Sequence, residues 1–264
     1  MKFNKPQYIS HFIKNNANIT LNSGESVIVY SISNDLTETE LNEWAKHILA
    51  HYTSQDDIIE GAKSNKISEQ KFIENFVLPS VSNQNQTKDV SGNFGEIVFC
   101  DFIEFVLEYS VPRYKLYGNP PGNPTQGIDI VAYKMDARPD PDDIILYAEV
   151  KASLSETIFS RLQDAINDIE KRKDKDFALA LNTAWRKLKL IGNVDEATKI
   201  KRFLDSEKPC KRVKSAGLIT TANACNTEDF VGVNISNGNT IETYVIYAPD
   251  LWELAKDLWK RASL

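Results

Sequence analysis

The chain has 264 residues, of which 42% are hydrophobic and 26% are charged, proportions typical of a folded globular protein. This length can bury a sizeable core, so the composition excludes a mainly disordered chain, and the modest numbers of glycine (11) and proline (10) exclude a collagen-like one. Acidic residues outnumber basic ones by 37 to 31, and the resulting formal charge of −6, taken alone, disfavours nucleic-acid binding.

The sequence shows neither a signal peptide nor a membrane span. The N-terminal segment lacks an apolar core, and nowhere do about 18 apolar residues follow one another. The cysteines Cys100, Cys210 and Cys225 are widely spaced without a CxxC pair, which argues against a disulfide framework or a zinc knuckle. We therefore expect a cytoplasmic protein with no membrane partner.

The segment 1–85 mixes strand and helix signals, which predicts an N-terminal α/β region that could dock a partner. Its predicted elements are a buried strand over residues 26–33 and helices over residues 37–52, 56–63 and 68–78. Pro79 ends the last of these helices, and the stretch over residues 80–89 is polar. We interpret this stretch as a linker or exposed loop, and we expect a second domain over residues 86–264.

The second domain opens with the most apolar helical stretch of the chain, over residues 91–109, which predicts a helix buried on several sides. The later predicted elements, in chain order, are an extended run over residues 111–117, a loop rich in glycine and proline over 118–127, strands over 128–133 and 144–152 joined by a turn over 136–143, an amphipathic helix over 153–173, a strand over 177–181, a helix over 196–204, strands over 216–221 and 243–247, and a helix over 249–261. This order predicts an α/β fold in which a mixed central sheet is flanked by helices.

Two acidic residues interrupt apolar strands of this domain. Asp129 is flanked by isoleucines, Glu149 is flanked by alanine and valine, and Lys151 follows two positions later. Because residues two apart on a strand share a face, Glu149 and Lys151 should point to the same side. Unpaired carboxylates inside a sheet are costly. A Mg²⁺ ion, or Mn²⁺ in its place, would bind carboxylate oxygens and relieve the repulsion between Asp129 and Glu149.

A metal ion held by carboxylates beside a lysine suits phosphodiester hydrolysis. Such an ion polarises the phosphate, acidifies a bound water and stabilises the leaving oxyanion, and a nearby lysine can position the water or neutralise developing charge. The sequence contains no GxSxG elbow, no Walker A loop and no GxGxxG fingerprint. The pattern therefore favours a metal-dependent phosphodiesterase that uses no organic cofactor.

The spacing of these residues resembles the PD-(D/E)XK nuclease superfamily. The segment GID ends at Asp129, the segment EVK begins at Glu149 on the next predicted strand, and a helix carrying the segment GNFGE, which ends at Glu96, precedes both. The resemblance implies a restriction-endonuclease-like core with one metal site. Ile128 replaces the proline that names the motif, and Gln163 occupies a place where some members carry a polar residue facing the site.

Carried over to this chain, the resemblance implies a role for each residue. Asp129 and Glu149 would bind the metal together with the main-chain carbonyl of Val150, and Glu96 would be the helix-borne acid that assists them. Lys151 would be the catalytic lysine. The resemblance thus implies a magnesium-dependent deoxyribonuclease.

Three longer segments, GNFGEIVFCDFIE, QGIDIVAYK and YAEVKASL, resemble the HamA family, the nuclease subunits of bacterial Hachiman antiphage systems. The resemblance runs over roughly residues 91–185. It implies a DNA nuclease that works with HamB, a superfamily 2 helicase, on double- or single-stranded DNA, and that stays inactive until the helicase engages DNA.

Other interpretations stay open at this point. The chain could be a non-catalytic adaptor that binds and regulates the helicase, or a stand-alone restriction or repair nuclease. Asp129, Glu149 and Lys151 could form a structural ion pair at the rim of the sheet. Glu96 could be a helix N-terminal acid that the helix dipole stabilises.

Two further pairs of residues favour packing over chemistry. His47 and His51 lie four apart on a predicted helix, one turn after Glu43, and this spacing can bind a transition metal. No second cluster completes such a site in the sequence, so we interpret both histidines as surface or core residues. Trp252 and Trp259 lie seven apart in an apolar helix and predict a core or partner-docking face more than a base-stacking platform.

The distribution of charge is more informative than its total. The segment over 171–214 contains 14 basic and 6 acidic side chains, a charge of +8, which leaves −14 for the rest of the chain. This basic segment directly follows the proposed catalytic strand and helix. We therefore expect it to contact the phosphate backbone of DNA, although such segments are often only solvated helix faces.

Overall fold

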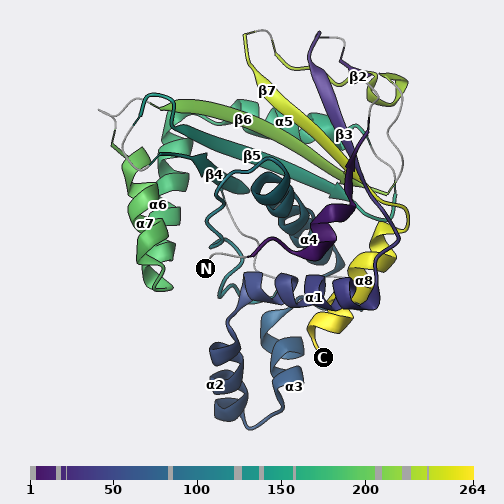
Figure 1. The fold of residues 1–264 in the computed structure, drawn as a ribbon, viewed down its shortest axis with the longest axis vertical. Coiled ribbons are helices and arrows are strands. Elements are labelled where there is room, and N and C mark those ends of the chain that lie inside the picture. The colour runs from purple at the N-terminus through teal and green to yellow at the C-terminus, as the bar shows by residue number, and fades with distance from the viewer. Residues whose placement is uncertain are drawn as a thin grey trace.

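A curled mixed sheet forms the centre of the molecule in this computed structural model (Figure 1). The structure describes residues 4–15, 19–21, 23–82, 86–121, 127–136, 140–156, 159–205, 210–221, 227–236 and 238–264. The strands are β1 (Phe12–Lys14), β2 (Ile19–Thr20), β3 (Ser26–Ile32), β4 (Ile130–Lys134), β5 (Ile144–Ser153), β6 (Lys211–Thr220) and β7 (Ile241–Tyr247). They lie in the order β1-β3-β7-β6-β5-β4, with β2 paired to β3.

The sheet is parallel at its centre and antiparallel at its edges. β3, β7, β6 and β5 pair in parallel, whereas β4 runs antiparallel to β5, and β1 and β2 run antiparallel to β3. The helical elements are η1 (Gln7–His11), α1 (Glu38–Tyr52), α2 (Gln55–Asn65), α3 (Glu69–Phe72), η2 (Ile73–Val77), α4 (Thr87–Asp101), η3 (Phe102–Val106), α5 (Arg161–Lys171), α6 (Asp174–Leu190), α7 (Val194–Phe203), η4 (Thr227–Phe230) and α8 (Leu251–Ala262). The predicted α/β class, a mixed sheet flanked by helices, is confirmed.

Helices cover both faces of the sheet, and the alternation of side chains along β5 divides the core in two. Leu146 and Ala148 belong to the core that contains α1, α4 and α8, whereas Ile145 and Tyr147 belong to the core that contains α5, α6 and α7. Successive strand residues point to opposite faces, so these cores lie on the two sides of the sheet. Figure 1 shows α4 in front of the sheet and α5 behind it.

Glycines let α4 approach the sheet closely. A Cβ atom at Gly95 of α4 would lie 2.7 Å from the Cβ of Ala152, and a Cβ atom at Gly217 of β6 would lie 2.6 Å from the ring of Phe99. Both distances are shorter than a carbon–carbon contact allows. This close packing fixes the position of Glu96, the residue that follows Gly95.

The N-terminal region adds to the same sheet. β3 pairs in parallel with β7, the last strand of the chain, and α1 packs against α8, the last helix. Capping boxes start α1 at Thr37 with Glu40 and α2 at Ser54 with Asp57. The division into two domains at residue 85 stays a prediction, as does the restriction-endonuclease-like identity of the core.

Most predicted elements are present, and one is wrong. The strand predicted over residues 177–181 lies inside helix α6. Phe177, Leu181, Ala184 and Leu188 are buried at helical spacing, and Asp174 and Asp176 occupy the first turn, so the helical period prevails over the short apolar run. The helix predicted over 153–173 is shorter, because β5 continues to Ser153 and α5 begins at Arg161.

The run over residues 111–117 has no regular secondary structure, and it follows a single bridge between Ser110 and Tyr133. The predicted linker, Gly/Pro loop and acidic turn lie partly outside the described residues, at 83–85, 122–126 and 137–139. The linker predicted over residues 80–89 is too long, because α4 begins at Thr87. No helix in the described part of the chain combines the length and the apolar character needed to cross a bilayer.

Candidate active site

Asp129 and Glu149 meet where β4 begins. The antiparallel register pairs Ile130 with Ala148, so its continuation places Asp129 opposite Glu149. The two carboxyl groups share a hydrogen bond, and the backbone N–H of Val150 donates to Oδ2 of Asp129 over 3.0 Å. Asp129 lies directly before β4 and not inside the predicted strand over 128–133, and it is nevertheless brought next to Glu149.

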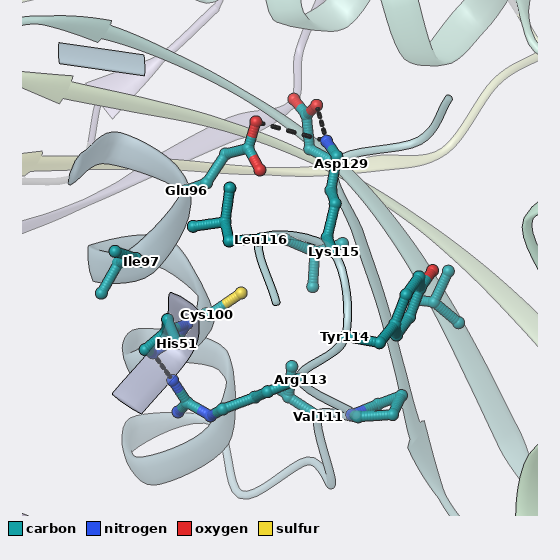
Figure 2. A pocket seen from close by; sticks show the side chains of 13 residues that line it. His51, Glu96, Ile97, Cys100, Val111, Arg113, Tyr114, Lys115, Leu116 and Asp129 are labelled. Atoms are coloured by element: carbon teal, nitrogen blue, oxygen red, sulfur yellow. Dashed lines mark hydrogen bonds and ion pairs between the residues drawn. The ribbon is translucent and has the colours of Figure 1, made fainter. Parts of the chain in front are cut away.

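Glu96 reaches the same place from α4. Its Oε1 lies 3.2 Å from Nζ of Lys115, and the same Nζ lies 2.7 Å from Oδ1 of Asp129 (Figure 2). The three side chains are only 13–16% exposed. The helix-borne acid and the strand-borne acid are thus joined by a buried lysine.

Burial and mutual repulsion shift the ionisation of these acids. Burial raises the pKa of Glu96 and of Glu149, and the charge of Asp129 raises both further. Burial also opposes ionisation of Asp129, but Lys115 and the hydrogen bonds from Lys115, Val150 and Glu149 hold its pKa below the usual range. Of the two acids, Asp129 therefore ionises more readily, while Glu149 holds a proton more strongly although Arg172 lowers its pKa.

Basic side chains surround the acids. Arg172, directly after α5, donates from Nη2 to Oε1 of Glu149 over 2.6 Å, and Glu149 is only 3% exposed. Lys151 points to the same side of the sheet as Glu149, where its Nζ lies 2.6 Å from Oδ2 of Asp168 on α5. Although partial burial opposes it, the hydrogen bond and charge of Asp168 raise the pKa of Lys151, which keeps this lysine a cation.

Lys115, Arg172 and Asp168 are absent from the sequence-based site. Arg172 belongs to the basic segment, but nothing in its spacing indicates a partner on strand β5. Lys115 lies in the extended run, where its side-chain direction depends on the path of the backbone. No local signal in the sequence identifies either contact.

An open cleft of about 710 Å³ lies beside the acids. Glu96, Asp129, Val150 and Lys151 line one part of it. Other lining residues that carry charge or an aromatic ring are Lys88, Glu156, Arg161 and Trp252. Trp252, predicted to form a core or partner-docking face, packs against the core and also lies on the wall of this cleft.

The chemistry of this site fits a hard divalent cation. Carboxylate oxygens are the ligands that Mg²⁺ and Mn²⁺ prefer, and three carboxylates meet beside an open cleft. The ligand atoms of Glu96, Asp129 and Glu149 do not all lie within 4.8 Å of one another. Among the described residues, a different group of three side chains meets that distance. Lys115 and Arg172 lie among the three carboxylates.

That other group consists of His47, His51 and Asp101, all buried. Nη2 of Arg113 lies 2.7 Å from Oδ1 of Asp101, while Nη1 lies 3.2 Å from Nε2 of His47 and contacts Nε2 of His51. The guanidinium therefore faces the three atoms that would bind a metal. Asp101, which lies on α4 and far from His47 in the sequence, completes the cluster that the sequence left incomplete, and Glu43 instead accepts a hydrogen bond from the backbone of Gln7.

This second group could hold a metal ion only if Arg113 withdrew. Asp101 also accepts a hydrogen bond from Tyr8 over 2.6 Å and is in contact with His47 over 2.8 Å. A cation, two histidines and a tyrosine thus compensate one fully buried carboxylate. Core packing, the predicted role of the two histidines, describes this arrangement.

The remaining predicted residues lie as follows. Gln163 accepts from the backbone N–H of Asn234 over 2.7 Å and donates to Asn167 over 2.8 Å, so these contacts lead away from the acids. Trp259 is buried in the core. The basic segment forms α6 and α7 beyond the β4 edge of the sheet (Figure 1).

The sequence matches a family model described as HamA over residues 6–262. A search of curated proteins found no match. The family match extends well beyond the segments quoted above and includes both the N-terminal region and the last helix.

Proposed function

This chain belongs to the HamA family of Hachiman antiphage defence proteins, and on that premise we propose that it is a metal-dependent DNA nuclease. The observation that carries the proposal is the meeting of Glu96, Asp129 and Glu149 with Lys151 beside an open cleft. A structural ion pair at the rim of the sheet would need one acid and one base. Here three carboxylates gather, Lys115 and Arg172 compensate part of their charge, and the open cleft gives a divalent ion access to Asp129 and Glu96.

The residues of the site have different roles in this proposal. Asp129, Glu149 and Glu96 would hold Mg²⁺, with the carbonyl of Val150 as a further ligand, and Mn²⁺ could replace it. When bound, the ion polarises the scissile phosphate and acidifies the attacking water. Lys151 stays protonated beside Asp168, so it acts by positioning the phosphate or neutralising its developing charge and not as a general base.

The surroundings of the site favour DNA as the substrate. Lys88 and Arg161 line the cleft, and Trp252 offers an aromatic face on which a base could stack. Helices α6 and α7 carry half of the 14 basic side chains of the basic segment. Several of its cations are already paired within the chain, Arg172 with Glu149 and Arg212 with Asp174 among them, so the surface offers less free positive charge than the sequence count indicates.

We further propose that the chain acts as the effector of a complex with a HamB-type superfamily 2 helicase. It has no Walker A loop of its own, so ATP-driven movement along DNA would need a partner. The N-terminal region, with the α2–α3 hairpin projecting from the body of the molecule (Figure 1), is the candidate docking surface. Family membership supports this partnership, and the nuclease would stay inactive until the helicase engages DNA.

A cleavage assay tests the proposal. The purified chain is incubated with linear and plasmid DNA in Mg²⁺, with and without the helicase and ATP, as wild type, Glu149→Gln and Lys151→Ala. Lys260→Ala is the matched control, because Lys260 is exposed on α8 and lies outside both the cleft lining and the basic segment. We expect the two site variants to lose cleavage by about a hundredfold or more and the control to keep it.

The outcomes separate the three interpretations. Cleavage that neither site variant reduces would remove the catalytic assignment. Absence of cleavage under every condition, with a stable helicase complex, would favour the adaptor. Robust cleavage by the isolated chain without the helicase would favour a stand-alone nuclease.

A further inference from the structure

Lys115 occupies the position that a metal ion would need. Its Nζ lies 2.7 Å from Asp129 and 3.2 Å from Glu96, and its side chain lines a small pocket together with residues of α4 and of the run over 111–116 (Figure 2). Mg²⁺ binds carboxylate oxygens at about 2.0–2.1 Å. An ammonium group this close to the same oxygens leaves no room for the ion, and the two positive charges would repel each other.

The backbone holds this lysine in place. The run over 111–117 has no regular secondary structure, but it is tied down on both sides of Lys115. Arg113 binds the buried Asp101 and contacts Glu104, and the hydroxyl of Tyr117 donates to Asp57 over 2.6 Å.

The N-terminal region supplies two contacts that hold the end of this run. Asp57 belongs to α2, and the backbone N–H of Gly118 donates to the carbonyl of Tyr52, the last residue of α1, over 2.9 Å. On the other side, Nζ of Lys187 from α6 donates to the carbonyl of Lys115 over 3.3 Å. The position of the ammonium group is therefore set by contacts from α1, α2 and α6.

The same run places one cation in each of the two acidic clusters. Arg113 faces His47, His51 and Asp101, and two residues later Lys115 faces Glu96 and Asp129. Figure 2 shows the two side chains leaving the run in different directions. In the first cluster the side chain of the cation is only 3% exposed, whereas the second cluster also borders the open cleft.

We propose that Lys115 is a built-in cation that occupies the metal position of the active site, so that a divalent ion binds Asp129 and Glu96 only when Lys115 is displaced. This inference rests on the proposed function, because it concerns the same metal site. It identifies the run over 111–117 as the segment that must move, and its anchors in α1 and α2 as the contacts through which a partner on the N-terminal region would act. In this conformation the acids are closed to the metal while the cleft is open to DNA.

Metal binding is the direct test. Mn²⁺ binding to the full chain is measured by electron paramagnetic resonance for wild type, Lys115→Met and Asp129→Asn. Lys151→Met is the matched control, since it removes one positive charge from the same cleft without freeing a ligand of the metal. We expect Lys115→Met to bind Mn²⁺ at least about tenfold more tightly than wild type, and Lys151→Met to change the affinity less than about threefold.

A second measurement needs no substitution. Lys115 of the wild-type chain is labelled with an amine-reactive reagent with and without Mn²⁺, and the extent of labelling is read by mass spectrometry. Displacement by the ion predicts faster labelling of Lys115, while labelling of exposed Lys211 stays unchanged. This readout stands even if Lys115→Met fails to fold.

The contrary results are distinct. Equal Mn²⁺ affinity of wild type and Lys115→Met, with binding lost in Asp129→Asn and labelling of Lys115 unaffected by the ion, would overturn the inference and leave the proposed nuclease site standing. Mn²⁺ binding that does not depend on Asp129 in any variant would refute the metal site itself, and with it the inference.

Discussion

Arg113 should contribute more to stability than any exposed cation of this chain. Its guanidinium compensates Asp101, a carboxylate with 0% exposure, over 2.7 Å. Removing one partner of a buried ion pair costs about 3–5 kcal/mol, because the other charge stays buried without compensation. Tyr8 and His47 remain in contact with Asp101, so for Arg113→Met we expect the lower end, about 3 kcal/mol.

This loss is large compared with the total free energy of unfolding. Domains of ordinary stability unfold with about 5–15 kcal/mol, and a loss of about 3 kcal/mol corresponds to more than a hundredfold in the unfolding equilibrium. Urea unfolding followed by tryptophan fluorescence gives the free energy of unfolding of each variant. Arg212→Met is the control, because Arg212 pairs with Asp174 where both side chains are more than half exposed, and we expect its cost to stay below about 1 kcal/mol.

A double-mutant cycle isolates the pair. If the cost of Arg113→Met arises from the uncompensated carboxylate, the same substitution in an Asp101→Asn background should cost clearly less. A loss for Arg113→Met below about 1 kcal/mol, or an equal loss in both backgrounds, would refute the reasoning. The first result would mean that Tyr8 and His47 suffice, and the second that Arg113 acts by packing alone.

Three further predictions concern packing, pH and DNA binding. Gly217→Ala should destabilise the chain by about 1–3 kcal/mol in the same unfolding assay, because the new Cβ would meet the ring of Phe99. Gly92→Ala should be neutral or stabilising, because Gly92 is helical and has open space around it. Equal effects of the two substitutions would contradict the close packing. Burial and nearby positive charge lower the pKa of His51, so below about pH 6.5 only the unfolded state binds the proton. The free energy of unfolding of wild type should therefore fall, relative to that of His51→Gln, by about 1.4 kcal/mol for each pH unit below that value. Parallel pH profiles of the two proteins would contradict this. Trp252→Ala should weaken binding of a single-stranded oligonucleotide by about tenfold in fluorescence anisotropy, and unchanged affinity would place the DNA elsewhere.

Local patterns in the sequence were sufficient for the strand-borne half of the candidate site. Asp129 and Glu149 stand out because each interrupts an apolar strand, and the antiparallel pairing of β4 and β5 brings them together. Glu96 enters the predicted site through the family resemblance of the segment that ends with it, and its distance from the sheet depends on Gly95 and Ala152, which only the packed structure relates.

The contacts that sequence reasoning missed all join residues through the tertiary structure. Lys115 reaches Asp129 from a run without regular secondary structure, and Arg113 joins His47 on α1 to Asp101 on α4. Neither hydrophobic period nor spacing encodes the path of such a run. The strand wrongly expected at residues 177–181 shows the opposite error, in which a short apolar segment was read without the capped helix around it.

In the proposed nuclease, Asp129 and Glu149 hold the metal ion on which DNA hydrolysis depends. The most direct test is the rate of DNA cleavage by the complete helicase complex across a Mg²⁺ titration, with a chelated baseline, for wild type and Asp129→Asn. We predict that wild type cleaves only when Mg²⁺ is present and that Asp129→Asn is slower by about a hundredfold or more throughout the titration. Cleavage by Asp129→Asn within about twofold of wild type, or cleavage that persists without divalent metal, would contradict the account.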